Sequence, residues 1–122
     1  MANILLFDDN VELLEMFQFL FTIHHYEIRT VNSKDLFYTK LQESKPDLII
    51  LDIMLKDADG TEICKELKED KETLDIPVIL ISASPNKLLD YGNCNADAVI
   101  EKPFTMAVLI NKIKSLLGHP VF

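Results

Sequence analysis

Cysteine, arginine and long apolar runs are all scarce in this chain of 122 residues. Its two cysteines, Cys64 and Cys94, lie thirty residues apart, which suits neither a metal site nor a disulfide framework. We therefore expect two reduced thiols, as in cytosolic proteins. No apolar stretch reaches the ~18 residues of a membrane span, and no basic segment precedes an apolar core at the N-terminus. The sequence predicts no membrane span and no signal peptide, and indicates a cytoplasmic protein.

Positive charge is also in short supply. Twelve basic residues stand against twenty acidic ones, the formal net charge is −8, and Arg29 is the single arginine. Nucleic-acid binding needs a cationic surface, so we expect none by this chain itself. No repeat or Gly/Ser linker divides the sequence, and its length suits one domain over residues 1–122.

Short apolar runs alternate with helical patterns along the whole chain. The expected strands are 3–8, 26–31, 48–51, 78–82 and 98–101. The expected helices are 11–23, 33–42, one that begins near Asp59, 84–91 and 105–117. Such alternation predicts an α/β fold, in which a parallel five-stranded sheet has helices on both faces. The pattern by itself leaves the strand order open.

The two longest helical patterns make specific predictions about which positions are buried. In 11–23, one 3.6-residue face carries Leu13, Phe17, Leu20 and His24. Further apolar residues fall outside this face, and we expect most to be core and one or two to serve a partner surface. They are Leu14, Met16, Phe19 and Phe21. In 105–117 the expected apolar positions are Val108, Leu109, Ile113, Leu116 and Leu117, and Gly118 should end the helix.

Polar side chains stand where four of the strands end. They are Asp8 and Asp9, Asp52, Ser82, and Lys102. In an open parallel sheet the carboxyl ends of the strands form the binding crevice, which would gather these groups. Crowded carboxylates repel one another, and a bound cation removes that cost. Oxygen ligands without histidine or cysteine favour Mg²⁺, and an aspartate can attack phosphorus. The sequence therefore predicts a site for Mg²⁺ and a phosphoryl group.

Five motifs in order carry a resemblance to a known family. They are Phe7–Asn10, Leu51–Leu55, Asp59-Gly60, Ile81–Ala83, and Ala96-Asp97 through Lys102–Phe104. Together they resemble the receiver domain of two-component response regulators of the chemotaxis-regulator type, over essentially the whole chain. This resemblance implies a flavodoxin-like doubly wound sheet of order 2-1-3-4-5 with five helices. The topological switch point would then lie between strands one and three.

The resemblance also implies roles for the residues at the strand ends. Asp52 would be the phosphoacceptor, and Asp8 and Asp9 would bind Mg²⁺ together with Asp52 and the backbone carbonyl of Met54. Ser82 would be the switch hydroxyl. Lys102 would pair with the phosphoryl group, and the Lys102-Pro103 peptide would be cis.

Three positions depart from the family pattern. Lys56 replaces the usual proline four residues after the phosphoacceptor, so that loop should be more mobile. Val99 replaces an aromatic residue three before the lysine, so output should depend on movement of the backbone and the fourth helix. Asn95 replaces a glycine, which asparagine tolerates in a left-handed conformation.

The function implied by the resemblance is that of a phosphorelay receiver. A histidine kinase or histidine phosphotransfer protein would phosphorylate Asp52, and the modified chain would change its affinity for a downstream protein effector or form a homodimer. Such a domain assists its own phosphorylation and hydrolysis but turns over no separate substrate, so we expect no enzyme. The alternatives are a receiver that works unphosphorylated as a fixed interaction module, a receiver cut from a longer DNA-binding regulator, and an aspartyl-phosphate phosphatase. A dehalogenase-type phosphatase needs two aspartates two residues apart after strand one, which Asp8-Asp9 does not supply.

Overall fold

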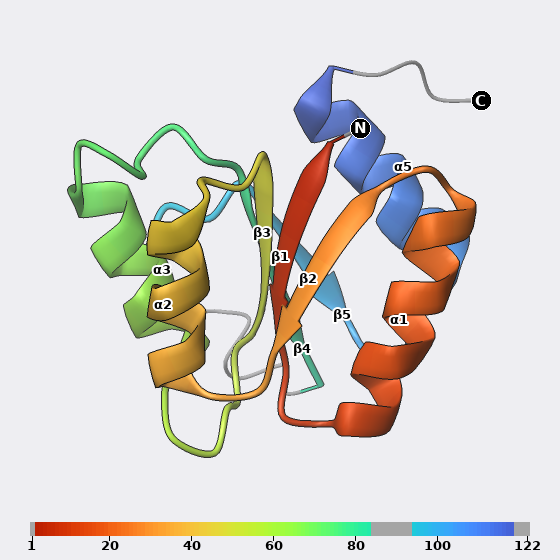
Figure 1. Cartoon of the computed structure of the whole chain (residues 1–122), viewed down its shortest axis with the longest axis horizontal. Helices are drawn as coiled ribbons and strands as arrows, with labels where there is room; N and C mark the ends of the chain where they lie inside the picture. Colours follow the sequence, from red (N-terminus) through yellow and green to blue (C-terminus); the bar gives the residue numbers. More distant parts are fainter. Residues whose placement is uncertain (1, 84–93, 119–122) are drawn as a thin grey trace.

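Strands and helices alternate along the computed structural model of this chain, which describes residues 2–83 and 94–118 (Figure 1). Within them the strands are β1 (Asn3–Phe7), β2 (Glu27–Val31), β3 (Leu48–Asp52), β4 (Val78–Ser82) and β5 (Ala98–Glu101). The helices are α1 (Val11–Ile23), α2 (Lys34–Glu43), α3 (Gly60–Glu69) and α5 (Met106–Leu117). The helix expected at 84–91 lies outside the described residues.

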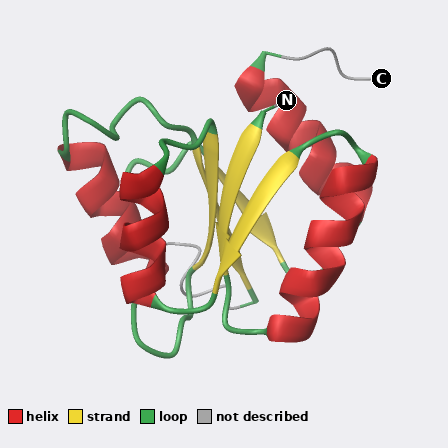
Figure 2. Cartoon of the chain, viewed as in Figure 1, coloured by secondary structure: helices red, strands yellow, loops and turns green. Residues whose placement is uncertain are grey.

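All five strands run parallel in one sheet, in the order β2-β1-β3-β4-β5. This confirms the flavodoxin-like order and puts the switch point between β1 and β3. Helices α1 and α5 cover one face of the sheet, and α2 and α3 cover the other (Figures 1 and 2). Among the described residues, no helix is both long and apolar enough to cross a membrane.

The apolar runs of the strands feed two cores, one on each face of the sheet. In β1, Ile4 and Leu6 belong to the core under α1 and α5, whereas Leu5 and Phe7 belong to the core under α2 and α3. Successive side chains of a strand point to opposite faces, so a strand covered on both sides must be apolar throughout. This requirement explains the unbroken hydrophobic runs of β1, β3 and β4.

The buried face of α1 is rotated from the predicted one. Leu14, Phe17 and Phe21 are buried in the structure, whereas Leu13 and Leu20 are half-buried. His24, predicted on the buried face, is an exposed residue at the helix C-cap. Almost every face of this helix carries apolar residues, so periodicity alone does not select the face that meets the sheet.

The prediction for α5 was wrong at Val108, which is exposed, and it missed Ile110, which is buried beside Leu109 and Ile113. The end of the helix was predicted correctly, because Gly118 adopts a left-handed conformation with φ of 75°. That conformation costs glycine no steric clash and satisfies the last carbonyls of the helix.

The two cysteines are both free, as expected, and the structure shows that both are buried. The Cys64 thiol of α3 donates a hydrogen bond to the carbonyl of Cys94, with a sulfur-to-oxygen distance of 3.4 Å. Burial raises the pKa of the Cys64 thiol, and the neighbouring Cys94 raises it further. A thiol held neutral in this way behaves as a small apolar core residue.

Helix α3 starts directly against the end of β3. The N–H of Gly60 donates to the carbonyl of Ile53 at 2.8 Å, and Gly60 is buried. A Cβ atom at this position would collide with the carbonyl oxygen of Asp52 and would lie 2.8 Å from the Cα of Ile53. Glycine is therefore required by a close approach of two backbones.

We expect Gly60→Ala to lower the free energy of unfolding by about 1–3 kcal/mol, because overpacking against a backbone cannot be relieved by a side-chain rotation. Urea denaturation followed by circular dichroism measures this change. Lys65→Ala, on the exposed face of the same helix, should alter stability by less than about 0.5 kcal/mol. Equal stability of the two variants would contradict the close-packing argument.

Candidate functional site at the carboxyl edge of the sheet

The loops after β1 and β3 lie together at the lower edge of Figure 1. Parallel pairing aligns Phe7 with Leu51, so the residues after β1 come beside Asp52 at the end of β3. On the other side, the N–H of Lys102 donates to the carbonyl of Ser82 at 2.9 Å, which ties the residue after β5 to the end of β4. The strand ends thus collect residues from four separate parts of the sequence.

A lysine ammonium sits against two carboxylates at this edge. Lys102 Nζ lies 2.9 Å from Asp52 Oδ2 and 3.6 Å from Asp8 Oδ2. The side chains of Asp8 and Asp52 are only 7% and 12% exposed. The second oxygen of Asp52, Oδ1, accepts a hydrogen bond from the N–H of Met54 at 2.9 Å. Both oxygens of Asp52 therefore have partners that define its orientation.

The electrostatics of the site follow from burying two acids beside one base. Desolvation raises the pKa of Asp8, and the charge of Asp52 raises it further. The N–H of Asn10, which donates to Asp8 Oδ1 at 2.9 Å, and the Lys102 ammonium act in the opposite direction. For Lys102, burial favours the neutral amine, but the hydrogen bond and charge of Asp52 outweigh it and raise the pKa. The site carries excess negative charge and attracts a cation.

Asp9 does not join the other two aspartates. Its Oδ2 accepts a hydrogen bond from the backbone N–H of Lys56, in the loop after β3, at 2.6 Å. In the part of the chain that the structure describes, no three acidic, histidine or cysteine side chains are grouped closely enough to hold a metal ion. The oxygen donors present are of the type that Mg²⁺ prefers, with two carboxylates assembled and the third turned toward the neighbouring loop.

Ser82 and Val99 lie on the last two strands. Ser82 is fully buried at the end of β4, one residue beyond Ile81, the partner of Asp52 in the sheet. Val99 is partly buried against the core beneath α2 and α3, where the resemblance implies an aromatic side chain. The expected cis peptide between Lys102 and Pro103 is confirmed, as is the left-handed Asn95 with φ of 62°.

Comparison with known proteins decides the family. A sequence model of the response regulator receiver domain matches residues 4–114. The chain belongs to this family. It is thus a receiver domain of two-component response regulators.

Among similar proteins, the polar-differentiation response regulator DivK of Brucella anthropi is 36% identical, and the match covers 95% of this chain and 96% of DivK. The phosphate regulon transcriptional regulatory protein PhoB of Pseudomonas aeruginosa is 34% identical over 94% of this chain and 51% of PhoB. The receiver thus spans about half the length of PhoB and of several other transcriptional regulators that it matches. A solved structure of TrrA from Thermotoga maritima, in complex with Mg²⁺ and BeF, has a TM-score of 0.85 and 29% identity, and covers 95% of this chain and 99% of TrrA.

Two further features of the receiver were not evident from sequence. Asn10, not Asp8 or Asp9, is the N-cap of α1, and its side chain accepts from the N–H of Leu13 at 3.1 Å. The aspartates are therefore not needed to cap the helix. The bond from Lys56 to Asp9 was also missed, although the absence of proline at position 56 is a signal that a backbone donor exists there.

An apolar groove adjoins the receiver site. It has a volume of about 670 Å³ and lies between α1 and the segment after β5. We call it the α1 groove, and its lining includes Leu13, Met16, Leu20, Lys102, Phe104 and Met106. Lys102 thus belongs both to the carboxylate site and to the wall of the groove.

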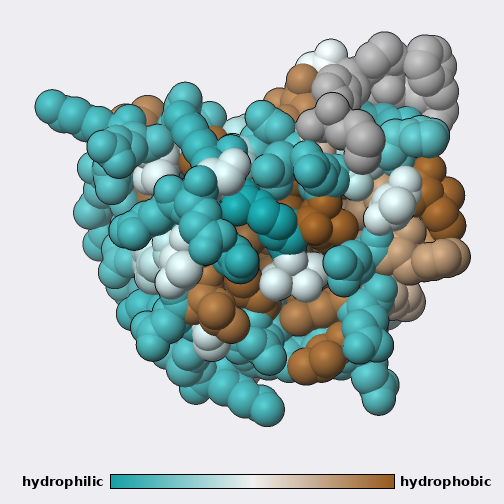
Figure 3. All heavy atoms as spheres, viewed as in Figure 1, coloured by the Kyte–Doolittle hydropathy of each residue, from teal (hydrophilic) through white to brown (hydrophobic). Residues whose placement is uncertain are grey.

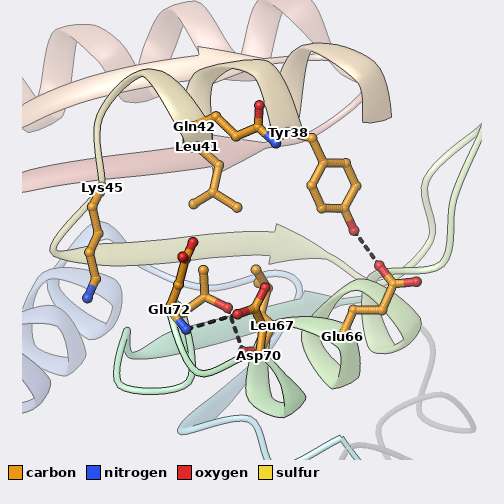
Figure 4. Close-up of a pocket in the computed structure, with 9 residues that line it drawn as sticks. Tyr38, Leu41, Gln42, Lys45, Glu66, Leu67, Asp70 and Glu72 are labelled. Carbon is orange, nitrogen blue, oxygen red and sulfur yellow. Dashed lines mark hydrogen bonds between the residues drawn. The ribbon is translucent and has the colours of Figure 1, made fainter.

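A second cavity, of about 510 Å³, lies between α2 and α3 (Figure 4). There the Tyr38 hydroxyl donates to Glu66 at 2.5 Å. None of the strand-end residues lines this cavity, so it is separate from the receiver site.

We expect Asp8→Asn to raise the free energy of unfolding at pH 7 by about 1 kcal/mol in buffer containing a chelator. The substitution removes a buried charge that repels Asp52, and an asparagine oxygen can still accept from the N–H of Asn10. Urea denaturation measures the change. Asp35→Asn, which makes the same change on the exposed first turn of α2, should not raise stability. Loss of stability in Asp8→Asn would mean that the attraction between Asp8 and Lys102 outweighs the desolvation of Asp8 and its repulsion by Asp52.

Proposed function

We propose that this receiver is the phosphoacceptor of a two-component phosphorelay and that Asp52 carries the phosphoryl group. The observation that supports this most directly is the placement of Asp52, whose carboxylate lies 2.9 Å from the Lys102 ammonium at the sheet's carboxyl edge. An oxygen of Asp52 attacks the phosphorus of a phosphohistidine on a histidine kinase or histidine phosphotransfer protein. The bond from phosphorus to the histidine nitrogen breaks, and an aspartyl phosphate forms.

The other side chains at the strand ends have supporting roles in this transfer. Mg²⁺ held by Asp8, Asp9, Asp52 and the carbonyl of Met54 would neutralise charge on the phosphoryl oxygens. Lys102 pairs with the phosphoryl group in place of its present pairing with Asp52. Ser82 donates its hydroxyl to a phosphoryl oxygen. The solved structure of TrrA in complex with Mg²⁺ and BeF is consistent with these roles.

The output is a change in protein affinity. A phosphoryl group adds negative charge beside Lys102, and the residues after β4 and β5 respond because the two segments are joined by the Lys102 to Ser82 backbone bond. The partner is a downstream protein effector, a further domain as in longer regulators such as PhoB, or a second copy of the chain. The chain itself, with net charge −8, does not bind nucleic acid. We place this activity in the cytoplasm and regard the receiver as a self-modifying switch, not an enzyme.

The donor protein approaches along α1. Three apolar residues spaced along this helix, Met16, Phe19 and Ile23, are exposed, and Phe19 is 67% exposed. Hydrophobic surface is visible on the side of the molecule that carries α1 (Figure 3). This row continues into the α1 groove, whose wall includes Lys102. A helix of the donor that buries its apolar face here brings its phosphohistidine beside Asp52.

The central experiment is phosphorylation by acetyl phosphate with Mg²⁺, followed by intact-protein mass spectrometry. We expect one phosphoryl adduct on the wild-type protein, and none on Asp52→Asn or in the presence of a chelator. A wild-type protein that stays unmodified would favour the fixed interaction module. Steady release of phosphate from unrelated phosphate esters would favour the phosphatase.

We expect Phe19→Ala to slow phosphoryl transfer from a phosphorylated donor protein about tenfold, as for the loss of a contact hot spot. The rate with acetyl phosphate should be unchanged, because a small donor does not need α1. Leu74→Ala, which removes an exposed apolar side chain from the segment after α3, is the matched control and should affect neither rate. Equal slowing by both variants would argue against docking on α1.

A further inference from the structure

The loops after β1 and β3 are joined by one short, charge-assisted hydrogen bond. The backbone N–H of Lys56 donates to Asp9 Oδ2 at 2.6 Å, across 47 residues of sequence. We propose that the Lys56 N–H is a latch that holds Asp9 away from the other two aspartates and thereby weakens Mg²⁺ binding. The proposal rests on the metal site of the proposed function and adds a residue that tunes its affinity.

The latch and the metal compete because they hold the Asp9 carboxylate in different places, the first against Lys56 and the second beside Asp8 and Asp52. As described above, Asp8 and Asp52 face the Lys102 ammonium, and with Asp9 against Lys56 no three carboxylates are grouped among the described residues. For Asp9 to join them, its carboxylate must turn from the Lys56 amide.

The loop cannot simply follow Asp9, since it is braced on its other side. Asp57 Oδ2 accepts from the N–H of Lys34 at the start of α2, at 3.1 Å. Met54 and Asp59 form an isolated antiparallel bridge across the base of the loop. Beyond them, Gly60 packs against the backbone of Asp52 with no room for a Cβ. The latch bond therefore breaks when Asp9 moves.

The change in Mg²⁺ affinity that the latch causes depends on the fraction of molecules in which the latch bond is formed. If the latched form holds nine-tenths of the molecules, the apparent dissociation constant for Mg²⁺ is about ten times the intrinsic one. A hydrogen bond from an amide to a charged carboxylate is strong enough to give a ratio of about ten. Lys56 is thus a positioning residue that acts through its backbone, and its side chain is incidental.

A pair of substitutions isolates the backbone donor. Lys56→Pro and Lys56→Ala both remove the ammonium, but only proline also removes the N–H. Magnesium chloride is titrated into each variant, and the dissociation constant is read from NMR amide shifts. We expect Lys56→Pro to bind Mg²⁺ about tenfold more tightly than Lys56→Ala. Equal constants, or weaker binding by the proline variant, would overturn the latch.

A second measurement on the wild-type protein does not depend on the folding of the proline variant. The Lys56 amide proton should show the downfield shift and slow hydrogen exchange of a bonded donor without Mg²⁺, and should lose both as Mg²⁺ is added. An amide that keeps them at saturating Mg²⁺ would overturn the proposal. If the latch fails while acetyl phosphate still modifies Asp52, the proposed function stands. If wild-type protein and both variants bind no Mg²⁺ and accept no phosphoryl group, both ideas fail.

Discussion

The rest of the site depends on the ion pairs that the Lys102 ammonium makes with two nearly buried carboxylates. Two acids at this edge of the sheet repel each other and lose hydration, so they stay together only beside a cation. Lys102 supplies one positive charge for Asp8 and Asp52, and the remaining negative charge stays uncompensated. The same residue is tied through its backbone to Ser82. In the proposed function, a change in the charge at Asp52 would reach the ends of β4 and β5 through Lys102.

The sheet makes this arrangement possible because the residues that stabilise the fold and the residues of the site lie in different parts of the strands. Apolar residues on both faces of β1, β3 and β4 fill two cores, which leaves the strand ends free to carry polar groups. The loops at that edge are braced by side-chain caps, as Asn10 and Asp59 show. Because these residues cap the helices, Asp8, Asp9 and Asp52 are not needed as caps and can take the roles proposed above.

Two neighbouring features adjoin the site, the α1 groove on one side and the loop after β3 on the other. The α1 groove begins at Lys102 and continues along an exposed apolar row on α1, which suits a helical partner. On the opposite side, the loop after β3 reaches α2 through Asp57 and Lys34. A donor protein and a bound cation would thus act on the same carboxylates from different sides.

Most of the architecture could be predicted from sequence, because strand and helix periodicities and the motifs at strand ends are local properties. The five strands, the extent of α1, the left-handed Asn95 and the end of α5 at Gly118 depend on residues close together in the chain. Only the tertiary structure decided which face of α1 is buried, that Val108 is exposed, and that Asp9 bonds to Lys56 instead of joining Asp8. These outcomes depend on contacts between segments far apart in sequence, where several apolar faces or hydrogen-bond partners are locally equivalent and packing selects one.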